Sequence, residues 1–334
     1  MKAIRLHGVG DLRFEQVPAP LPPKDKEVTL SVSVAGICGS DLHNYKTGAW
    51  ITRAPSVAGH EFTGTVTAIG TGVDHVAPGD RVVVDSRHIC GTCEACLDGV
   101  GQVCPSLGFL GEVIDGGFAE AVTIPARNVI KAPEGVADRF LAMAEPLAVA
   151  LHALNLVSVP DGAEIVVTGC GPIGGLVTLL ATRKGHPVRI IDQNAGRTAL
   201  VAEATGASMT TLEDLQGHRF RFAIDTTGNA YVIRTLLHRI AGASRLGLVG
   251  IGKAAEIIDP VHLVEREIAL IGCHAFGDEL TEIAAMLPEL KDHLDPFIAD
   301  IIEPEAVPAT YEALIAGDAA GIKTLIRLGG AGDE

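Results

Sequence analysis

Membrane-length apolar runs and a secretory leader are both missing from this 334-residue sequence. No apolar run reaches the roughly 18 residues that a membrane span needs, because Glu145, Pro146 and His152 interrupt the longest one, residues 140–154. The N-terminal segment MKAIRLHGVG has neither an apolar core nor a small-residue cleavage site, so it does not match a signal peptide. These absences predict a soluble, cytoplasmic protein without a membrane partner.

Basic and aromatic residues are also scarce. Lys and Arg number 26 against 41 Asp and Glu, which gives a net charge of −15. Such a surface repels nucleic-acid phosphates and so argues against a nucleic-acid partner. Aromatic residues make up 4% of the chain, whereas glycine occurs 39 times. This composition favours an α/β core of small aliphatic side chains with many tight turns, and the length allows about two domains.

Cysteine is rare outside one short segment, CGTCEACLDGVGQVC, which holds four of the seven cysteines. In a cytoplasmic protein the seven cysteines are expected to be ligands or buried apolar residues, because disulfides are rare there and would be strained between cysteines three residues apart. Four thiolates at this spacing suit tetrahedral zinc, and an iron–sulfur cluster is the alternative. Because four protein ligands close the coordination shell, the sequence predicts a structural zinc in a lobe at about residues 88–106, held by Cys90, Cys93, Cys96 and Cys104.

Two patterns of secondary structure divide the chain. Residues 1–130 favour β-strands, among them 27–36, 62–70 and 80–86, which are separated by turn signals. Residues 137–156 favour a helix, and the proline within it predicts a kink.

From about residue 164 the pattern changes to short apolar strands that alternate with helical segments. The predicted strands are 163–169, 187–192, 221–228, 244–250 and 267–272. Repeated units of this kind predict a parallel sheet with helices on both faces, a doubly wound α/β fold. The residues from about 278 onward predict two helices and one short strand, KTLIRL.

The segment GCGPIGG follows the first of these strands. Its Gly169, Gly171 and Gly174 match G-x-G-x-x-G, and Pro172 and Ile173 open the next helix. In this motif the glycines allow a tight turn, the approach of a pyrophosphate and close helix–strand packing. Because a strand precedes it and a helix follows, we interpret it as a dinucleotide-binding loop; a glycine-rich turn without a ligand is the alternative.

The choice of dinucleotide depends on the end of the next strand. Asp192 follows Gly174 by about 18 residues, close to the spacing at which a carboxylate contacts the adenosine ribose. That carboxylate would repel a 2′-phosphate, which favours NAD over NADP. Arg197 lies further along, as a helix-surface residue or a neighbour of the adenine.

Polar residues in three further segments suggest a second metal site. They are Cys38, Ser40, Asp41 and His43 in AGICGSDLH, His60 and Glu61 in VAGHEFTG, and Glu145 in MAEPLAVA. Taken singly, the cysteine and His60 could be ordinary core residues, but a carboxylate in an apolar stretch needs a cation or a hydrogen-bond donor. Cys, His and Glu are ligands of catalytic zinc sites that keep one open position, and such a zinc can activate an alcohol for hydride transfer.

The sequence resembles the zinc-dependent medium-chain alcohol and polyol dehydrogenases over essentially the whole chain. The resemblance lies in the order and spacing of five segments: CGSDLH, GHE, the four-cysteine segment, EPLAVALHA and GCGPIG. The resemblance implies a GroES-like, β-rich catalytic domain made of residues 1–150 and 278–334. It also implies a Rossmann NAD-binding domain made of residues 151–277, two zinc ions per chain, and a homodimer or homotetramer.

The resemblance also implies roles for single residues. Cys38 and His60 would bind the catalytic zinc, with Glu61 as a permanent or exchangeable ligand. Glu145 would take the remaining position, directly or through a water. Ser40 would pass the substrate's proton towards His43, and Asp41 would orient a ligand.

The substrate implied by the resemblance is a secondary alcohol that is oxidised to a ketone. Glu145, followed by Pro and Leu, resembles the branch of sorbitol, xylitol and L-idonate dehydrogenases. Two features depart from that branch: Asn44 replaces an aromatic residue, and CHAFGDEL contains no arginine. A small diol is therefore an alternative substrate, and a threonine dehydrogenase is a further relative.

Two other classes are less consistent with these residues. Zinc-free reductases that use NADPH would lack Cys38, His60 and Glu145 and would favour a cation in place of Asp192. A structural protein on the same fold would not need an open metal site.

Overall fold

The structure is a computed structural model that describes residues 1–252, 258–317 and 321–329. It divides into two compact units. Unit 1 comprises Met1–Glu145 and Leu280–Glu334, and unit 2 comprises Pro146–Glu279. The boundaries expected from the sequence, after residues 150 and 277, lie close to these, and residues 330–334 of the expected first domain lie outside the described part.

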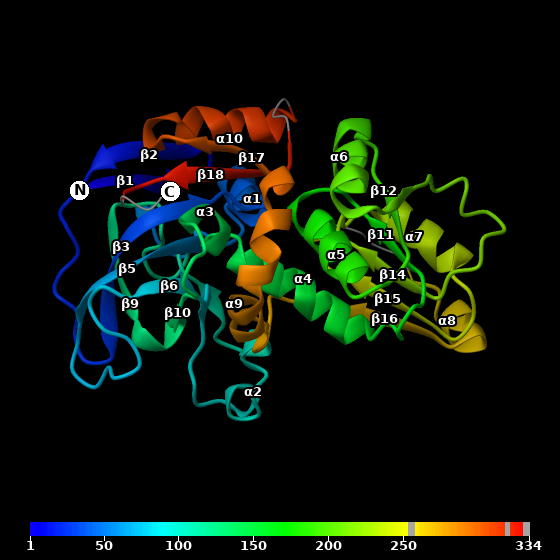
Figure 1. Cartoon of the computed structure of the whole chain (residues 1–334), viewed down its shortest axis with the longest axis horizontal. Helices are drawn as coiled ribbons and strands as arrows, with labels where there is room; N and C mark the ends of the chain where they lie inside the picture. Colours follow the sequence, from blue (N-terminus) through cyan, green and yellow to red (C-terminus); the bar gives the residue numbers. More distant parts are fainter. Residues whose placement is uncertain (253–257, 318–320, 330–334) are drawn as a thin grey trace. The chain divides into compact units, whose positions relative to one another are not determined.

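Unit 1 contains most of the predicted β structure. Its largest described sheet has seven strands in the order β10-β6-β5-β3-β18-β17, with β9 also paired to β3. These strands are β3 (Glu27–Gly36), β5 (Glu61–Ile69), β6 (Arg81–Val84), β9 (Ala121–Pro125), β10 (Val129–Lys131), β17 (Ile298–Ile302) and β18 (Lys323–Arg327) (Figure 1). Burial alternates along the first half of β3 and is continuous in its second half, so one end of this strand lies in the core.

Two smaller described sheets complete the β structure of unit 1. One has the order β2-β1-β4 and the other pairs β7 with β8. Their bounds are β1 (Lys2–Gly8), β2 (Asp11–Gln16), β4 (Ser56–Val57), β7 (Arg87–His88) and β8 (Gly108–Phe109). A short helix, α2 (Glu94–Leu97), lies between β7 and β8 in the chain and carries part of the four-cysteine segment.

Several sequence expectations for unit 1 need correction. The first 130 residues also form α1 (Gly39–Thr47), directly after β3. The C-terminal part contains α9 (Glu279–Leu290) and α10 (Val307–Ala316) as expected, but β17 accompanies β18 there. Its sequence, IADII, is interrupted by an acidic residue, which obscures the strand pattern.

The expected kink at Pro146 is wrong. The chain forms α3 (Asp138–Leu141), turns at Ala142 and Met143, and begins α4 (Ala144–Val157). Pro146 therefore lies in the first turn of α4, where its missing N–H has no intrahelical partner to lose. Residues 138–157 are long and apolar enough to cross a membrane by length and composition alone, but 83% of the 18-residue window that passes this test is buried inside the structure, as in a core helix.

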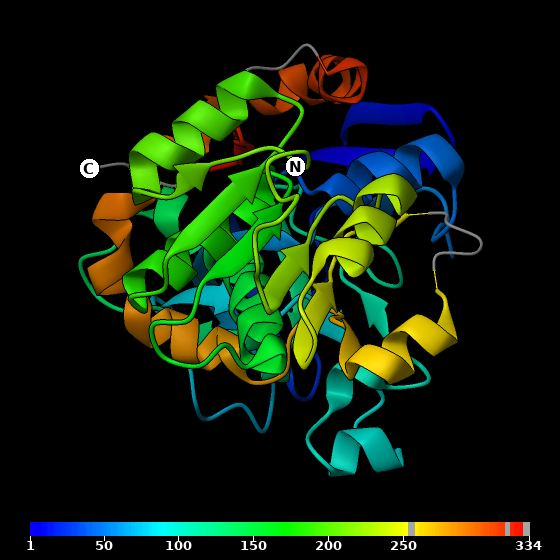
Figure 2. The ribbon, with the colours of Figure 1, turned by 90° about the vertical axis from the view of Figure 1, so that its right-hand side faces the viewer.

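Unit 2 contains six described parallel strands in the order β13-β12-β11-β14-β15-β16. They are β11 (Ile165–Thr168), β12 (Val188–Ile191), β13 (Ser208–Met209), β14 (Phe222–Asp225), β15 (Ser244–Leu248) and β16 (Ile268–Gly272), and they lie side by side in Figure 2. The intervening helices are α5 (Pro172–Arg183), α6 (Ala195–Thr205), α7 (Ala230–Arg239) and α8 (Pro260–Arg266).

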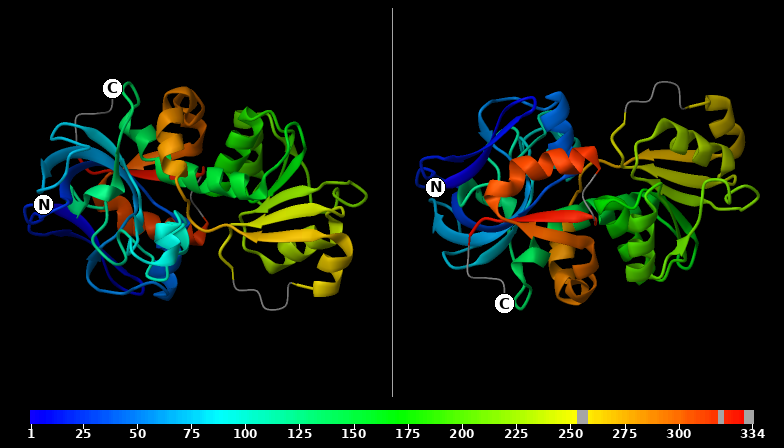
Figure 3. Two further views of the ribbon diagram at one scale, coloured as in Figure 1. Left: turned by 90° about the horizontal axis from the view of Figure 1, so that it is seen from below. Right: turned by 90° about the horizontal axis from the view of Figure 1, so that it is seen from above.

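Helices cover both faces of this parallel sheet. Figure 3 shows the green helices α5 and α6 on one side and the yellow helices α7 and α8 on the other. All four residues of β11 are buried, as expected for a central strand covered on both faces. The sheet therefore has the doubly wound arrangement that the alternating sequence pattern predicts.

Candidate metal and cofactor sites

Cys38, His60 and Glu61 come together in unit 1, although the first is more than 20 positions from the others in the sequence. One ligand atom from each of the three residues lies within 4.8 Å of the other two. Cys38 directly precedes α1, whereas Glu61 opens β5 opposite Gly36 of β3. Donors bound to one zinc ion lie roughly 3.3–3.8 Å apart, given the usual Zn–S, Zn–N and Zn–O lengths. The three residues therefore fit a zinc ion after a small contraction.

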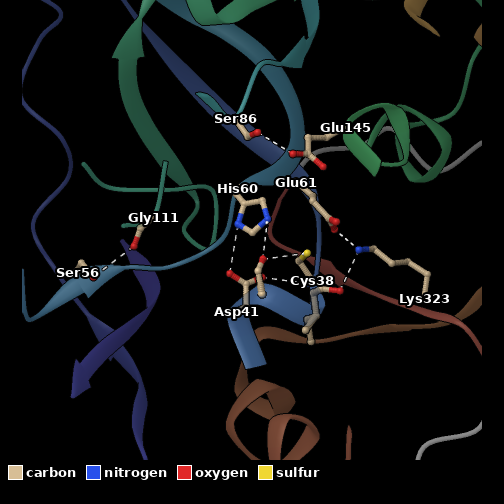
Figure 4. Close-up of polar contacts among 11 residues, drawn as sticks. Cys38, Asp41, Ser56, His60, Glu61, Ser86, Gly111, Glu145 and Lys323 are labelled. Atoms are coloured by element: carbon tan, nitrogen blue, oxygen red, sulfur yellow. Dashed lines mark hydrogen bonds and ion pairs between the residues drawn. The ribbon is translucent and has the colours of Figure 1, made fainter. Parts of the chain in front are cut away.

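Asp41 fixes the orientation of the His60 ring (Figure 4). One carboxylate oxygen of Asp41 accepts the backbone N–H of Cys38 at 2.9 Å, and the other lies 3.3 Å from His60 Nδ1. This contact leaves Nε2 of His60 facing the cysteine, which is the usual orientation of a metal-binding histidine. Burial alone would lower the pKa of His60, but Asp41 and Cys38 raise it well above its ordinary value. The negative charges of Asp41 and Cys38 thus favour a cation on the His60 ring. That cation can be a proton or a metal ion that displaces the proton.

The hydroxyl group of Ser40 lies inside the same cluster. Its Oγ is 3.1 Å from Cys38 Sγ and 3.4 Å from His60 Nε2. His43 follows three positions later on α1, so both side chains share one helix face. The described residues form no direct hydrogen bond between Ser40 and His43. The His43 ring contacts Trp50 instead, with ring centroids 5.0 Å apart.

Glu61 has a partner that the sequence analysis missed. The Lys323 ammonium group forms an ion pair with the Glu61 carboxylate and donates a hydrogen bond to the carbonyl of Ile37 at 2.9 Å (Figure 4). The exposed fraction of the Lys323 side chain is 0% and that of Glu61 is 1%. A lysine directly before the buried apolar residues of KTLIRL was the available signal.

Glu145 lies outside the group formed by Cys38, His60 and Glu61, since the four residues do not all share the 4.8 Å separation. Its carboxylate accepts a hydrogen bond from the hydroxyl of Ser86 at 2.7 Å. Burial raises the pKa of Glu145 to about 7. The role of Glu145 as a zinc ligand stays a prediction.

The four cysteines of the lobe also converge. One ligand atom of each residue lies within 4.8 Å of the others. The Sγ–Sγ distances are 3.9 Å for Cys90–Cys96, 3.8 Å for Cys93–Cys104 and 3.6 Å for Cys90–Cys104. In a tetrahedral zinc–thiolate site, two sulfur ligands lie about 3.8 Å apart. Backbone N–H groups, that of Thr92 first, lower the pKa of Cys90 to about 5, which favours a thiolate ligand.

The glycine-rich loop of unit 2 has the geometry of a dinucleotide-binding turn. Gly169 has φ +92, and a side chain at Gly174 would lie 1.8 Å from the carbonyl oxygen of Gly169. A side chain at Gly171 would meet nothing within 4 Å, so this position faces open space. Pro172 and Ile173 begin α5, whose unpaired N–H groups form an anion-binding helix end.

Asp192 lies beside this loop, directly after β12. Its carboxylate accepts the backbone N–H groups of Cys170 at 2.6 Å and Asn194 at 2.7 Å. Both bonds hold the carboxylate at the carboxyl end of the sheet, the edge where α/β proteins bind dinucleotides. Arg197 lies in the first turn of α6, where its backbone N–H is capped by Asn194.

Comparison with known proteins identifies the family. A model of the alcohol dehydrogenase GroES-like domain matches residues 24–134. An uncharacterized zinc-type alcohol dehydrogenase-like protein of Haemophilus influenzae is 30% identical over 320 residues, 92% of this chain and 93% of that protein. The chain belongs to the zinc-type alcohol and polyol dehydrogenase family. Sorbitol dehydrogenase of Bos taurus is 30% identical to this dehydrogenase over 341 residues, which are 96% and 94% of the two chains.

Solved structures support the same fold for the dehydrogenase. The alcohol dehydrogenase RspB of Escherichia coli CFT073, complexed with NADH, superposes with a TM-score of 0.90 at 27% identity over 98% of this chain and 99% of that one. A zinc-binding dehydrogenase of Sinorhizobium meliloti 1021, bound to NADP, superposes with a TM-score of 0.90 at 26% identity over 98% of both chains. The predicted family and fold class are thus confirmed, and the protein is an oxidoreductase of the zinc type.

Proposed function

We propose that this dehydrogenase oxidises a secondary alcohol, of the polyol, sugar-acid or diol type, to a ketone with NAD as the hydride acceptor. The observation that carries the proposal is the cluster of Cys38, His60 and Glu61, with the Ser40 hydroxyl inside it. The proposal assigns unit 1 as the catalytic domain and unit 2 as the NAD-binding domain.

Each residue of the cluster has a defined task in this proposal. Cys38 and His60, with Glu61 or Glu145 as a further ligand, would hold a zinc ion, and that ion would supply a Lewis acid that lowers the pKa of the alcohol hydroxyl. Ser40 would accept the hydroxyl proton as it releases its own towards His43, which would pass it to solvent. Because the two side chains share no direct hydrogen bond within the described chain, this transfer requires an intervening water or hydroxyl group.

The loop at Gly169–Gly174 and the helix end behind it would hold the pyrophosphate of NAD. The Asp192 carboxylate would accept hydrogen bonds from the adenosine ribose, because each of its oxygens retains a lone pair beyond its one backbone N–H contact. The negative charge of Asp192 would repel the 2′-phosphate of NADP. The four-cysteine lobe would bind a second, structural zinc.

A small vicinal diol is the second candidate substrate. Asn44, where a polyol dehydrogenase would place an aromatic residue, is buried, and its side-chain oxygen accepts the backbone N–H of Trp50 at 2.8 Å. It therefore holds a loop in place instead of contacting a long polyol chain. We also expect a homodimer or homotetramer, because β16 lies at the edge of the described sheet and Val261 and Val264 of α8 are exposed. The expected location of the protein is the cytoplasm.

The test is NADH formation by the purified protein on secondary alcohols, sugar alcohols, aldonic acids and small diols, with NADP measured in parallel. We expect activity with NAD and two zinc ions per chain by elemental analysis. Cys38→Ser should abolish activity and remove one zinc, whereas Cys273→Ser, a change outside both clusters, should alter neither. Full activity of Cys38→Ser would refute the ligand assignment, and an inactive protein with one zinc would refute the enzymatic proposal.

A further inference from the structure

A small cavity of about 10 Å³ in unit 1 is lined by Asp41, the residue that holds His60. Asn44, Glu112 and Tyr311 add three more polar side chains to its wall. A cavity needs about 10–15 Å³ to hold one water molecule, and that water needs two to four polar partners. The space and its lining therefore match a single water.

Tyr311 supplies the clearest sign that this cavity binds something. Its side chain is 1% exposed, and within the described chain its hydroxyl oxygen is buried without a hydrogen-bond partner. Its ring packs edge-on against Tyr45, with centroids 5.6 Å apart. The Tyr45 hydroxyl, in contrast, contacts the Glu312 carboxylate and the carbonyl of Gly10. Leaving a buried hydroxyl without a partner costs about 1–3 kcal/mol, so a bound water at Tyr311 is strongly favoured.

Glu112 adds a half-buried carboxyl group to the wall of the cavity. It lies in the turn of residues 111–113, which follows β8. Burial raises the pKa of Glu112 to about 7; the charge of His60 opposes this shift, and the charge of Asp41 adds to it. A water donor between the two carboxylates would relieve both the burial and the repulsion.

We propose that the cavity binds one ordered water that joins the Tyr311 hydroxyl to the carboxylates of Asp41 and Glu112. Tyr311 and Glu112 are then positioning residues: the water restrains Asp41, and Asp41 keeps Nε2 of His60 turned towards Cys38. This inference rests on the proposed zinc site at Cys38 and His60. It assigns a function to α10, a helix about 250 positions away from those residues in the sequence.

A crystal structure of the zinc-loaded protein and the rate of zinc release to a chromogenic chelator test the proposal. The crystal structure should show a water within hydrogen-bonding distance of Tyr311 Oη and Asp41. The release phase that disappears in Cys38→Ser reports the site at Cys38 and His60. Tyr311→Phe, which keeps the ring but removes the hydroxyl, should speed that phase roughly three- to tenfold, less than the 10–100-fold typical of a direct partner of a ligand.

Tyr45→Phe is the matched control, because it removes a hydroxyl from the same ring pair but one that points to Glu312 and Gly10. We expect it to leave the release phase within about twofold of the native rate, since it has no link to Asp41. Glu112→Gln should speed release in the same direction as Tyr311→Phe. A native rate in both Tyr311→Phe and Glu112→Gln, or a cavity without water, would overturn the inference while leaving the zinc site intact. Unchanged release phases in Cys38→Ser would instead overturn the proposed site itself.

Discussion

Lys323 and Glu61 form a fully buried ion pair that connects the start of β18 to the start of β5. The pair fits because the residue between them, on β3, is Gly36. A side chain at Gly36 would lie 2.6 Å from the Glu61 carboxylate and 2.8 Å from Cε of Lys323. Both strands pair with β3 at this glycine, so the sheet register brings the two charges together.

Removing the charge of Lys323 should strongly destabilise unit 1. Lys323→Met keeps the length of the side chain but leaves the Glu61 carboxylate buried and unpaired, which typically costs about 3–5 kcal/mol. Chemical denaturation after zinc is removed from the site at Cys38 and His60 measures the loss, so that no metal ion compensates the charge of Glu61.

Two comparisons separate this effect from a general loss of lysine charge. Lys131→Met removes the partner of Asp80 in an exposed ion pair; the Lys131 side chain is 64% exposed. This change should cost less than about 1 kcal/mol. Adding Glu61→Gln to Lys323→Met should restore part of the stability, because the unpaired charge is then removed. Equal losses in Lys323→Met and Lys131→Met would contradict a special role for the buried pair.

Losing one cysteine of the lobe should affect stability before chemistry. Cys93→Ser removes one of four ligands of the proposed structural zinc, so elemental analysis should show about one zinc fewer per chain. The Tm should fall by several degrees, since each 1 kcal/mol shifts it by about 2–4 °C in a unit of this size. The activity per remaining catalytic zinc should stay within about twofold of native, because a closed site has no open position for substrate. A parallel loss of activity at unchanged Tm would show that the lobe takes part in catalysis.

Local patterns in the sequence predicted much of the fold and supplied most residues of the candidate site. The dinucleotide-binding loop is an example, because its parts follow one another along the chain: β11, the turn at Gly169 and the carboxylate of Asp192. Their spacing in the sequence was enough to predict that they lie close together. Cys38 and His60 were predicted as ligands from residue type within short motifs and from the resemblance that these motifs carry, and the structure brings them close together. The ends of the parallel strands were predictable because each is a short apolar run between turn signals.

The parts that the sequence did not reveal depend on contacts between distant segments. Lys323 looks like an exposed strand residue until β18 is known to pair with β3. The hydroxyl of Ser86 meets Glu145 only through the tertiary structure. Pro146 favoured a kink, but the helix begins just before it, and only the cap geometry distinguishes these two outcomes.

Replacing Asp192 should change the choice of nucleotide. Asp192→Ala should raise the KM for NAD roughly 10–100-fold, because hydrogen bonds to a charged acceptor contribute about 1.5–3 kcal/mol. The KM for NADP should fall or stay constant, since the repulsion of its 2′-phosphate disappears. Steady-state kinetics with both nucleotides gives the ratio. Asp192→Asn, which removes the charge but keeps one acceptor oxygen, should lie between the two proteins. An equal rise in KM for both nucleotides would mean that Asp192 only supports the loop at Cys170.

The contact between His152 and Glu279 in unit 2 should make stability depend on pH in the acid range. Nδ1 of His152 lies 2.9 Å from the Glu279 carboxylate. Burial alone would raise the pKa of Glu279, but the hydrogen bond from His152 lowers it below its ordinary value of 4.5. A lowered carboxyl pKa stabilises the folded state above about pH 4.5, and the contribution disappears as the pH falls through the folded pKa.

Glu279→Gln should therefore cost about 1–3 kcal/mol at pH 7, and its deficit relative to native should shrink below about pH 4.5. Denaturation at a series of pH values measures this deficit, with the exposed Glu282→Gln on the same helix as the control. A deficit that stays constant down to pH 3 would contradict the role of the ionised Glu279 carboxylate.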